Sequence, residues 1–213
     1  MHRFGGFVSM KANGDGTESP YEINITLFDA CMGTRRGIDH FQIARFLCSQ
    51  AMMMVLQGIP AVYIQSLLAS ANDLNHVEQT GRTRSINRRI WQDDELRYLL
   101  ENPVSNQSEV FNALTHMIRV RRRQLAFHPN ATQEVISVNT DLFVVRRQFR
   151  DISEDQVIFA LSNVTDRILH LPLSILGFLK KDYVDILHNP SEKIGDIITL
   201  HPYQSLWLTN NPR

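Results

Sequence analysis

Four arginines lie close together in one polar stretch of the chain, residues 72–89, and they are Arg82, Arg84, Arg88 and Arg89. A guanidinium group is a rigid fork that can hold two oxygens of one ligand, such as a vicinal diol or a phosphate. The stretch follows a segment that we interpret as a buried strand, and loops after such strands often carry the chemistry of α/β folds. A solvated basic loop without a ligand is the alternative interpretation, and composition alone leaves it open.

A second candidate is the pair Tyr21-Glu22, which places an aromatic ring next to a carboxylate. Pro20 and the polar neighbours predict a loop over residues 20–24. This loop would be either a substrate-facing segment or an ordinary surface turn, and composition favours the surface turn.

Other groups of polar or sulfur-containing residues are better explained by structure than by chemistry. Asn13-Gly14-Asp15-Gly16 has too few carboxylates for a calcium loop and predicts a turn. Met52-Met53-Met54 is expected to fill core space. The arginines of residues 119–123 suit the C-terminal end of a helix, and no aromatic residues are interleaved to stack nucleotide bases. His76 alone does not indicate catalysis. We therefore expect no metal and no cofactor.

The bulk composition excludes some partners. The chain has 213 residues, with 22 Lys plus Arg and 22 Asp plus Glu, so no global field favours nucleic acid or an anionic membrane. No apolar run approaches the ~20 residues that cross a bilayer. Cys31 and Cys48 lie in or near apolar sequence, and no signal peptide is evident at the start. We expect reduced core thiols and a cytoplasmic protein.

The segment from Gln57 to Ile64 is the element that must position the polar stretch. Gly58 and Pro60 break a preceding helix, and four uncharged residues, 61–64, then predict a strand buried on both faces. Such a strand needs a neighbour on each side, and this sequence supplies no other convincing parallel strand. The rest of the sheet is therefore expected to lie outside the sequence or to be missing.

Apolar periodicity predicts helices over Ile38–Leu56, Asp93–Leu100 and Ser108–Leu125. Asp39 or Thr34 is the expected cap of the first, and Ser108 is the expected cap of the third. After His128-Pro129-Asn130 the period changes to that of short antiparallel strands. The predicted strands are Glu134–Asn139, Leu142–Phe149, Gln156–Asn163, Arg167–Leu173, Tyr183–Leu187 and Ile197–Leu208.

Several motifs together resemble the sucrose phosphorylase branch of glycoside hydrolase family 13, the α-amylase family. The branch includes phosphorylases of sucrose, glucosylglycerol and glucosylglycerate, and the resemblance covers nearly the whole chain. The motifs are Tyr21–Asn24, Arg45–Ala51, Gly58–Tyr63, Thr80–Arg88 and Ala126–Pro129.

The resemblance implies an α/β plus all-β fold, namely the C-terminal part of a (β/α)₈ TIM barrel followed by an antiparallel β domain. Residues 1–130 would be the barrel part and residues 131–213 the β domain. On that fold, 38–56 is similar to the seventh helix, 59–64 to the eighth strand and 108–125 to the eighth helix.

The family is retaining: an aspartate attacks the glucosyl carbon, a glutamate acts as acid and then base, and inorganic phosphate is the co-substrate. No motif here matches those two carboxylates, so the chain alone is expected to be inactive. Arg84 matches the arginine that holds glucose hydroxyls. Tyr21 and Glu22 match the mobile loop at the acceptor and phosphate site. Sucrose phosphorylases typically have Gln at the position of Glu22, which favours glycerol or glycerate over fructose and leaves those two open.

The expected partners are a small sugar substrate and phosphate, without nucleic acid or membrane. Association of copies through exposed barrel surface is a further expectation. Two alternatives remain: a non-catalytic module for sugar binding or assembly, and an inert remnant of a truncated gene. A line of exposed aromatics on the β domain would favour the module, and the sequence offers only scattered ones, such as Tyr203 and Trp207.

Overall fold

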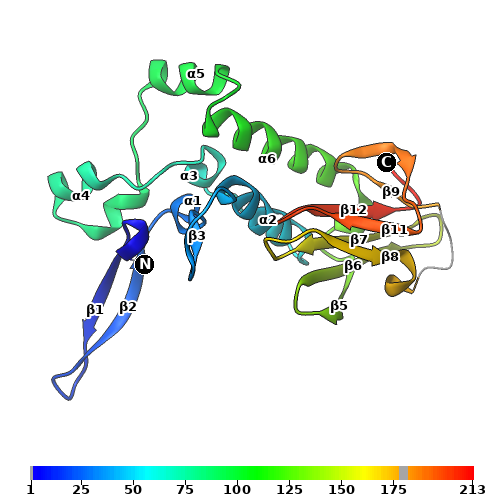
Figure 1. Ribbon diagram of the computed structural model, residues 1–213, viewed down its shortest axis with the longest axis horizontal. Helices are drawn as coiled ribbons and strands as arrows, with labels where there is room; N and C mark the ends of the chain where they lie inside the picture. The colour runs from blue at the N-terminus through cyan, green and yellow to red at the C-terminus, as the bar shows by residue number, and fades with distance from the viewer. Residues whose placement is uncertain (1, 178–181) are drawn as a thin grey trace. The chain divides into compact units, whose positions relative to one another are not determined.

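The computed structural model describes residues 2–177 and 182–213, and they form two compact units (Figure 1). Unit 1 consists of residues 1–46 and 62–112, and unit 2 consists of residues 47–61 and 113–213. Helix α2, Gln42–Val55, begins in unit 1 and ends in unit 2. These units are groups of packed residues, and the domain boundary near residue 130 remains a prediction.

Unit 1 begins with an antiparallel hairpin of β1, Phe7–Ala12, and β2, Glu18–Asn24. The turn between them is the predicted one, and the Asn13 amide closes it by donating to the Thr17 carbonyl oxygen at 2.8 Å. The expected loop over residues 20–24 is wrong, because these residues form most of β2 and pair with β1. Pro20 is tolerated in a two-stranded ribbon because an edge strand needs fewer backbone donors.

The polar stretch 72–89 is also not a loop. It contains helix α4, Leu74–Thr80, and the 3₁₀ helix η2, Thr83–Asn87. The Asp73 side chain accepts from the amide of His76 at 2.9 Å at the start of α4, and Gly81 ends it with φ of 64°. Capping residues at both ends thus allow a helix whose composition is almost entirely polar.

The predicted helices are present with shifted ends. The Asp39 carboxylate accepts from the Phe41 amide at 2.9 Å just before α2, as expected. Helices α5, Asp93–Glu101, and α6, Asn106–Arg123, match the other two predictions. The cap of α6 differs, because the Ser105 hydroxyl accepts from the amide of Ser108 at 3.0 Å and Ser108 does not serve as the cap.

The predicted strand over residues 59–64 is not formed. Residues 59–63 have no strand assignment, and Ile59 is 85% exposed. Helix α3, Ile64–Leu67, begins where the strand was expected to end. A strand must satisfy its backbone groups on neighbouring strands, and no strand of the described residues pairs with this segment.

Short elements complete unit 1. They are η1, His2–Phe4; α1, Leu27–Ala30; β3, Gly33–Thr34; and β4, Gly37–Ile38. The aromatic rings of Phe28 and Phe46 pack edge to face with centroids 5.5 Å apart. Both cysteines, Cys31 and Cys48, are buried and neither forms a disulfide, which agrees with the prediction of reduced core thiols.

Unit 2 contains the predicted antiparallel module. Its main sheet has six strands in the order β10-β9-β12-β7-β6-β5, and a two-stranded sheet pairs β11 with β8. The strands are β5, Thr132–Asn139; β6, Leu142–Arg150; β7, Asp155–Asn163; β8, Leu169–Pro172; β9, Val184–Asp185; β10, Asn189–Lys193; β11, Ile197–Leu200; and β12, Ser205–Thr209. Two short 3₁₀ helices also occur: η3, Leu125–Phe127, and η4, Leu173–Leu176.

The single strand predicted over Ile197–Leu208 is in fact two strands. A turn separates β11 from β12. In it the Gln204 amide donates to the His201 carbonyl oxygen at 3.1 Å, and Tyr203 has a φ of 55°. Strand β10 was not predicted at all. Its five residues are exposed and largely polar, so they lack the apolar alternation that marks a strand.

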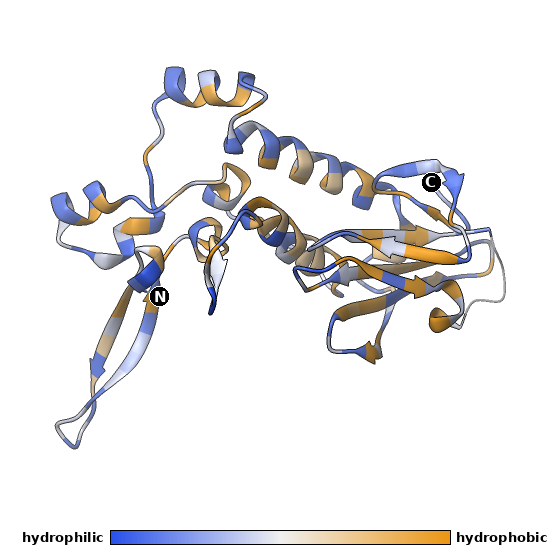
Figure 2. Cartoon of the chain, viewed as in Figure 1, coloured by the Kyte–Doolittle hydropathy of each residue, from blue (hydrophilic) through white to orange (hydrophobic). Residues whose placement is uncertain are grey.

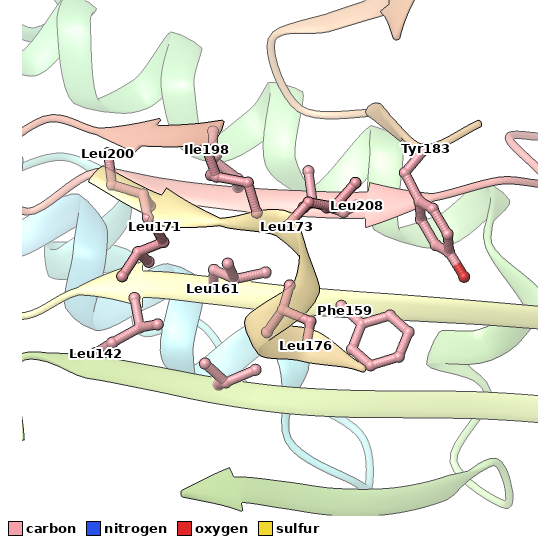
Figure 3. Packing of buried hydrophobic residues seen from close by; sticks show 12 residues of the cluster. Leu142, Phe159, Leu161, Leu171, Leu173, Leu176, Tyr183, Ile198, Leu200 and Leu208 are labelled. Carbon is pink, nitrogen blue, oxygen red and sulfur yellow. The ribbon is translucent and has the colours of Figure 1, made fainter. Parts of the chain in front are cut away.

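One face of the six-stranded sheet packs against β8, β11 and η4 (Figure 3). Alternate residues of β6, β7 and β12 point into this core, as the period of two requires. They are Leu142, Val144, Phe159, Leu161, Leu206 and Leu208.

The residues between them in sequence lie on the other face, where Ala160 and Trp207 are buried as well. Trp207 is fully buried and packs edge to face on Phe127, with ring centroids 4.7 Å apart. Ser205 Oγ lies 3.9 Å from Cys48 Sγ of α2. In Figure 2 the ribbon of α2 is hydrophobic along most of its length, as a helix covered on several sides should be.

Arg147 is a fully buried cation on that second face. Its guanidinium donates to the carbonyl oxygens of Val55 at 2.8 Å, His128 at 2.9 Å, Thr132 at 3.2 Å and Ala131 at 3.3 Å. Burial, together with the nearby charge of Arg121, lowers the pKa of Arg147 to about 10. The group therefore stays charged at neutral pH and ties the C-terminal end of α2 to the sheet.

Within the described ranges, no helix is both long enough and apolar enough to cross a bilayer.

Candidate functional site

Strand β2, helix α4 and helix η2 surround an open cavity of about 870 Å³ in unit 1. The three candidate residues predicted from sequence, Tyr21, Glu22 and Arg84, all line it. The fold thus brings the two motifs together although 62 positions separate Glu22 from Arg84. The remaining lining residues are Ser9, His76, Thr80, Gly81, Arg82, Thr83, Ser85 and Arg88.

Arg84 and Glu22 form an ion pair across the cavity, with Arg84 Nε donating to Glu22 Oε2 at 2.7 Å. The hydrogen bond to Glu22 raises the pKa of Arg84, and the charge of Glu22 and the Tyr21 phenol act in the same direction. The side chains of Arg84 and Glu22 remain 55% and 33% exposed. Both side chains are therefore accessible to a ligand that replaces the hydrogen bond between them with hydrogen bonds of its own.

The ion pair also offsets the negative charge of Glu22. A carboxylate next to a phosphate is repulsive unless a cation pairs with it. Here Arg84 is that cation, so Glu22 does not present an uncompensated negative charge to the cavity.

Helix η2, which carries Arg84, is fixed from several sides. Ile86 is fully buried, and its carbonyl oxygen accepts from the Asp73 amide at 2.8 Å. The carbonyl oxygen of Asn87 accepts from the Tyr63 hydroxyl at 2.9 Å. The hydroxyls of Ser9 and Thr83 lie 3.1 Å apart and join the hairpin to η2.

The sequence did not single out two further groups at this cavity, Ser9 and His76. Ser9 also accepts from Asn24 Nδ2 at 2.8 Å, which orders the hairpin end next to Thr83. In the described part of the chain, Nδ1 of His76 is buried without a hydrogen-bond partner. Nothing in the sequence distinguished His76 from an ordinary surface histidine, because only the structure shows that it lines the cavity and that its Nδ1 is buried.

Glu22 is the one carboxylate among the residues that line this cavity. A retaining glycosidase mechanism needs two carboxyl groups about 5–5.5 Å apart. Groups of three or more His, Cys, Asp or Glu side chains able to hold a metal ion do not occur in the described ranges. The cavity can therefore bind and orient a polyol or an oxyanion, but it does not contain the pair that breaks a glycosidic bond.

Comparison with known proteins gives the family. No family model matches the chain. A glucosylglycerate phosphorylase of Escherichia coli is 35% identical over 209 residues, which cover 98% of this chain and 35% of the relative. A sucrose phosphorylase of Agrobacterium vitis is 34% identical over 125 residues, covering 59% of this chain and 22% of the relative.

Solved structures share the fold. The crystal structure of sucrose 6F-phosphate phosphorylase from Thermoanaerobacter thermosaccharolyticum matches with a TM-score of 0.58 and 21% identity, over 78% of this chain and 32% of that one. The chain spans about a third of the length of these proteins or less. It belongs to the sucrose phosphorylase-like branch of glycoside hydrolase family 13, and it corresponds to a C-terminal portion with the end of the TIM barrel and the antiparallel β domain.

Proposed function

We propose that this chain supplies part of the substrate site of a retaining α-glucoside phosphorylase. In this proposal Arg84 holds hydroxyls of the transferred glucosyl unit, and Tyr21 and Glu22 line the place where acceptor and phosphate exchange. Inorganic phosphate takes the glucosyl group, giving glucose 1-phosphate. The nucleophile and the acid/base come from sequence outside this chain, which alone is inactive.

One observation carries the proposal: Arg84, Tyr21 and Glu22 line a single cavity, with Arg84 and Glu22 in direct contact. A diol-binding arginine and an acceptor-side loop have to be neighbours in a glucosyl-transfer site, because donor and acceptor share the bond that is broken. The presence of one lining carboxylate where the mechanism needs two supports the inactivity of the chain alone.

We further propose glucosylglycerate as the donor, ahead of sucrose. The E. coli relative with this name matches almost the whole chain, whereas the sucrose phosphorylase of A. vitis matches little more than half of it. Glu22, in place of the glutamine typical of sucrose phosphorylases, supports the same choice. Two buried thiols that form no disulfide suit a reducing compartment, which supports a cytoplasmic location.

The structure does not favour a non-catalytic sugar-binding module. That alternative would need exposed aromatics in a line on the β domain, where sugar rings could stack. Tyr203 and Trp207 are instead buried, Trp207 completely.

A fusion enzyme tests the proposal. This chain would replace the matching third of the E. coli relative, and the folded product would be incubated with phosphate and one of glucosylglycerate, glucosylglycerol or sucrose. We expect glucose 1-phosphate, formed fastest from glucosylglycerate. A folded fusion that releases none from any donor would refute the phosphorylase assignment, and preference for sucrose would refute the choice of donor.

A further inference from the structure

The four arginines between residues 82 and 89 have different surroundings in the structure. Arg89 does not line the cavity: it donates to Glu95 at 2.6 Å and lies 4.1 Å over the Trp91 ring. Arg84 lines the cavity but is paired with Glu22. Arg82 and Arg88 also line it, and neither has an ion-pair partner in the parts of the chain that the structure describes.

This distribution leaves the cavity with an unbalanced positive charge. Three arginines line it against the single carboxylate of Glu22. Because Arg84 already holds that carboxylate, the excess charge belongs to Arg82 and Arg88. Cavities lined by one sign of charge concentrate small ions of the opposite sign.

The backbone that carries both arginines is fixed before any ligand arrives. Arg82 precedes η2, and its carbonyl oxygen accepts from the Ser85 amide at 3.0 Å. Arg88 follows η2 and lies between two anchored residues, since Asn87 accepts from Tyr63 and the Arg89 carbonyl oxygen accepts from Gln65 Nε2 at 2.8 Å. A ligand would therefore order two side chains only, which lowers the entropic cost of binding.

We propose that Arg82 and Arg88 form an oxyanion subsite that binds the charged group of the co-substrate, either the phosphate or the carboxylate of an acidic acceptor. This inference rests on the proposed function and adds the residues that recognise charge. Guanidinium groups bind both anions through two parallel charge-assisted hydrogen bonds, and a neutral polyol lacks the charge that strengthens them. Arg84 keeps the separate role of holding glucosyl hydroxyls, because its guanidinium group is already paired with Glu22.

The experiment measures binding and does not depend on turnover. The 213-residue chain is titrated with inorganic phosphate, with D-glycerate and with glycerol, and binding is followed by NMR chemical shifts at low and at high ionic strength. The variants are Arg82→Gln and Arg88→Gln. The matched control is Arg97→Gln, an arginine 65% exposed on α5 and outside the cavity lining. Circular dichroism verifies the fold of each variant.

We expect both anions to bind and glycerol not to bind, with weaker binding at high salt. Each cavity variant should weaken anion binding at least about tenfold, the scale of one charge-assisted hydrogen bond, and Arg97→Gln should not. Binding of phosphate alone would assign the subsite to phosphate, and binding of both anions would assign it to either.

Glycerol binding as strong as that of the anions, or variants that bind like the unchanged chain, would overturn the proposal. An equal loss in Arg97→Gln would also overturn it, by showing diffuse charge attraction. None of these outcomes bears on glucosyl transfer itself, which the fusion enzyme tests separately.

Discussion

At the scale of single residues, Arg84 has the clearest expected effect. In the fusion enzyme, Arg84→Ala should lower kcat/KM roughly 10- to 100-fold, because a charge-assisted hydrogen bond to the transferred sugar is lost. The loss should be equal for all donors, since each carries the same glucosyl unit. Steady-state kinetics with the three donors measures it.

Arg97→Ala is the control for this substitution. Arg97 pairs with exposed Asp93 at 3.1 Å on α5 and does not line the cavity, so its removal should leave the kinetics unchanged. A loss in Arg84→Ala that is confined to one donor would show that Arg84 recognises the acceptor and not the glucosyl unit.

His188 and Asp185 give a pH-dependent prediction. His188 Nδ1 lies 2.6 Å from the buried Asp185 carboxylate, and this hydrogen bond raises the pKa of His188. A raised pKa in the folded state adds stability below the unfolded value near 6.5, and that stability is lost as pH rises through the folded pKa. His188→Asn should therefore destabilise the chain at pH 5.5 more than at pH 8.5.

The expected size is below about 1 kcal/mol, because the His188 side chain is 53% exposed and water screens the pair. Thermal melts at both pH values measure the difference. His170→Asn is the matched control, since His170 contacts the Thr199 hydroxyl and not a carboxylate. A His188→Asn effect that is equal at both pH values would contradict the ion-pair explanation.

The sequence identified Tyr21, Glu22 and Arg84 as candidates but did not predict their contact. Ion pairing across 62 positions depends on how the hairpin and η2 pack, and no local pattern encodes that. Arg82 and Arg88 were visible as part of a basic cluster, yet only the structure separates them from Arg84 and Arg89.

At the scale of elements, Arg147 is the strongest expected determinant of stability. Arg147→Met would leave four carbonyl oxygens, of Val55, His128, Ala131 and Thr132, without this donor, and the bonds to Val55 and Ala131 are buried. We expect a loss of roughly 3–5 kcal/mol, comparable to breaking a buried ion pair. Urea unfolding of the purified chain measures it.

Arg150→Ala on the same strand is the control. Arg150 is 71% exposed and pairs with Asp155 at the surface, so its loss should cost less than about 1 kcal/mol. Equal losses of unfolding free energy in the two variants would contradict the prediction that the buried Arg147 contributes more to stability than the exposed Arg150.

The sequence predicted those elements whose apolar residues recur with the period of a helix or a strand. Helix α2 and strands β6 and β7 carry strong apolar periods and were found nearly in place. Helix α4 was missed because it has too few apolar residues to show a helical period. Its capping residues are its main sequence signal. Segment 59–64 has the composition of a buried strand, but pairing depends on neighbours that the described residues do not provide.

At the scale of the whole molecule, two groups of residues should differ in protection from hydrogen exchange. Strands β6, β7 and β12 have buried side chains on both faces, and Arg147 donates to the carbonyl oxygen of Val55 at the end of α2. Residues 59–63 and the β1–β2 hairpin have few buried apolar side chains; Ile59 and Tyr63 are exposed. We expect slow exchange in the first group and fast exchange in the second.

Mass spectrometry of the exchanging chain gives this measurement, with sedimentation run alongside to record self-association. The exposed apolar residues of unit 1 could be covered by a second copy, so protection is compared at two concentrations. Uniformly strong protection of residues 59–63 in a proven monomer would contradict the view that this segment needs further strands.

The most direct test compares glucose 1-phosphate formation by the isolated chain and by the fusion enzyme, under identical conditions with glucosylglycerate and phosphate. The account predicts no product above the blank from the chain, because one carboxylate lines its cavity, and clear product from the fusion. Turnover by the isolated chain would contradict the account, because the cavity would then have to break the glycosidic bond without the second carboxylate.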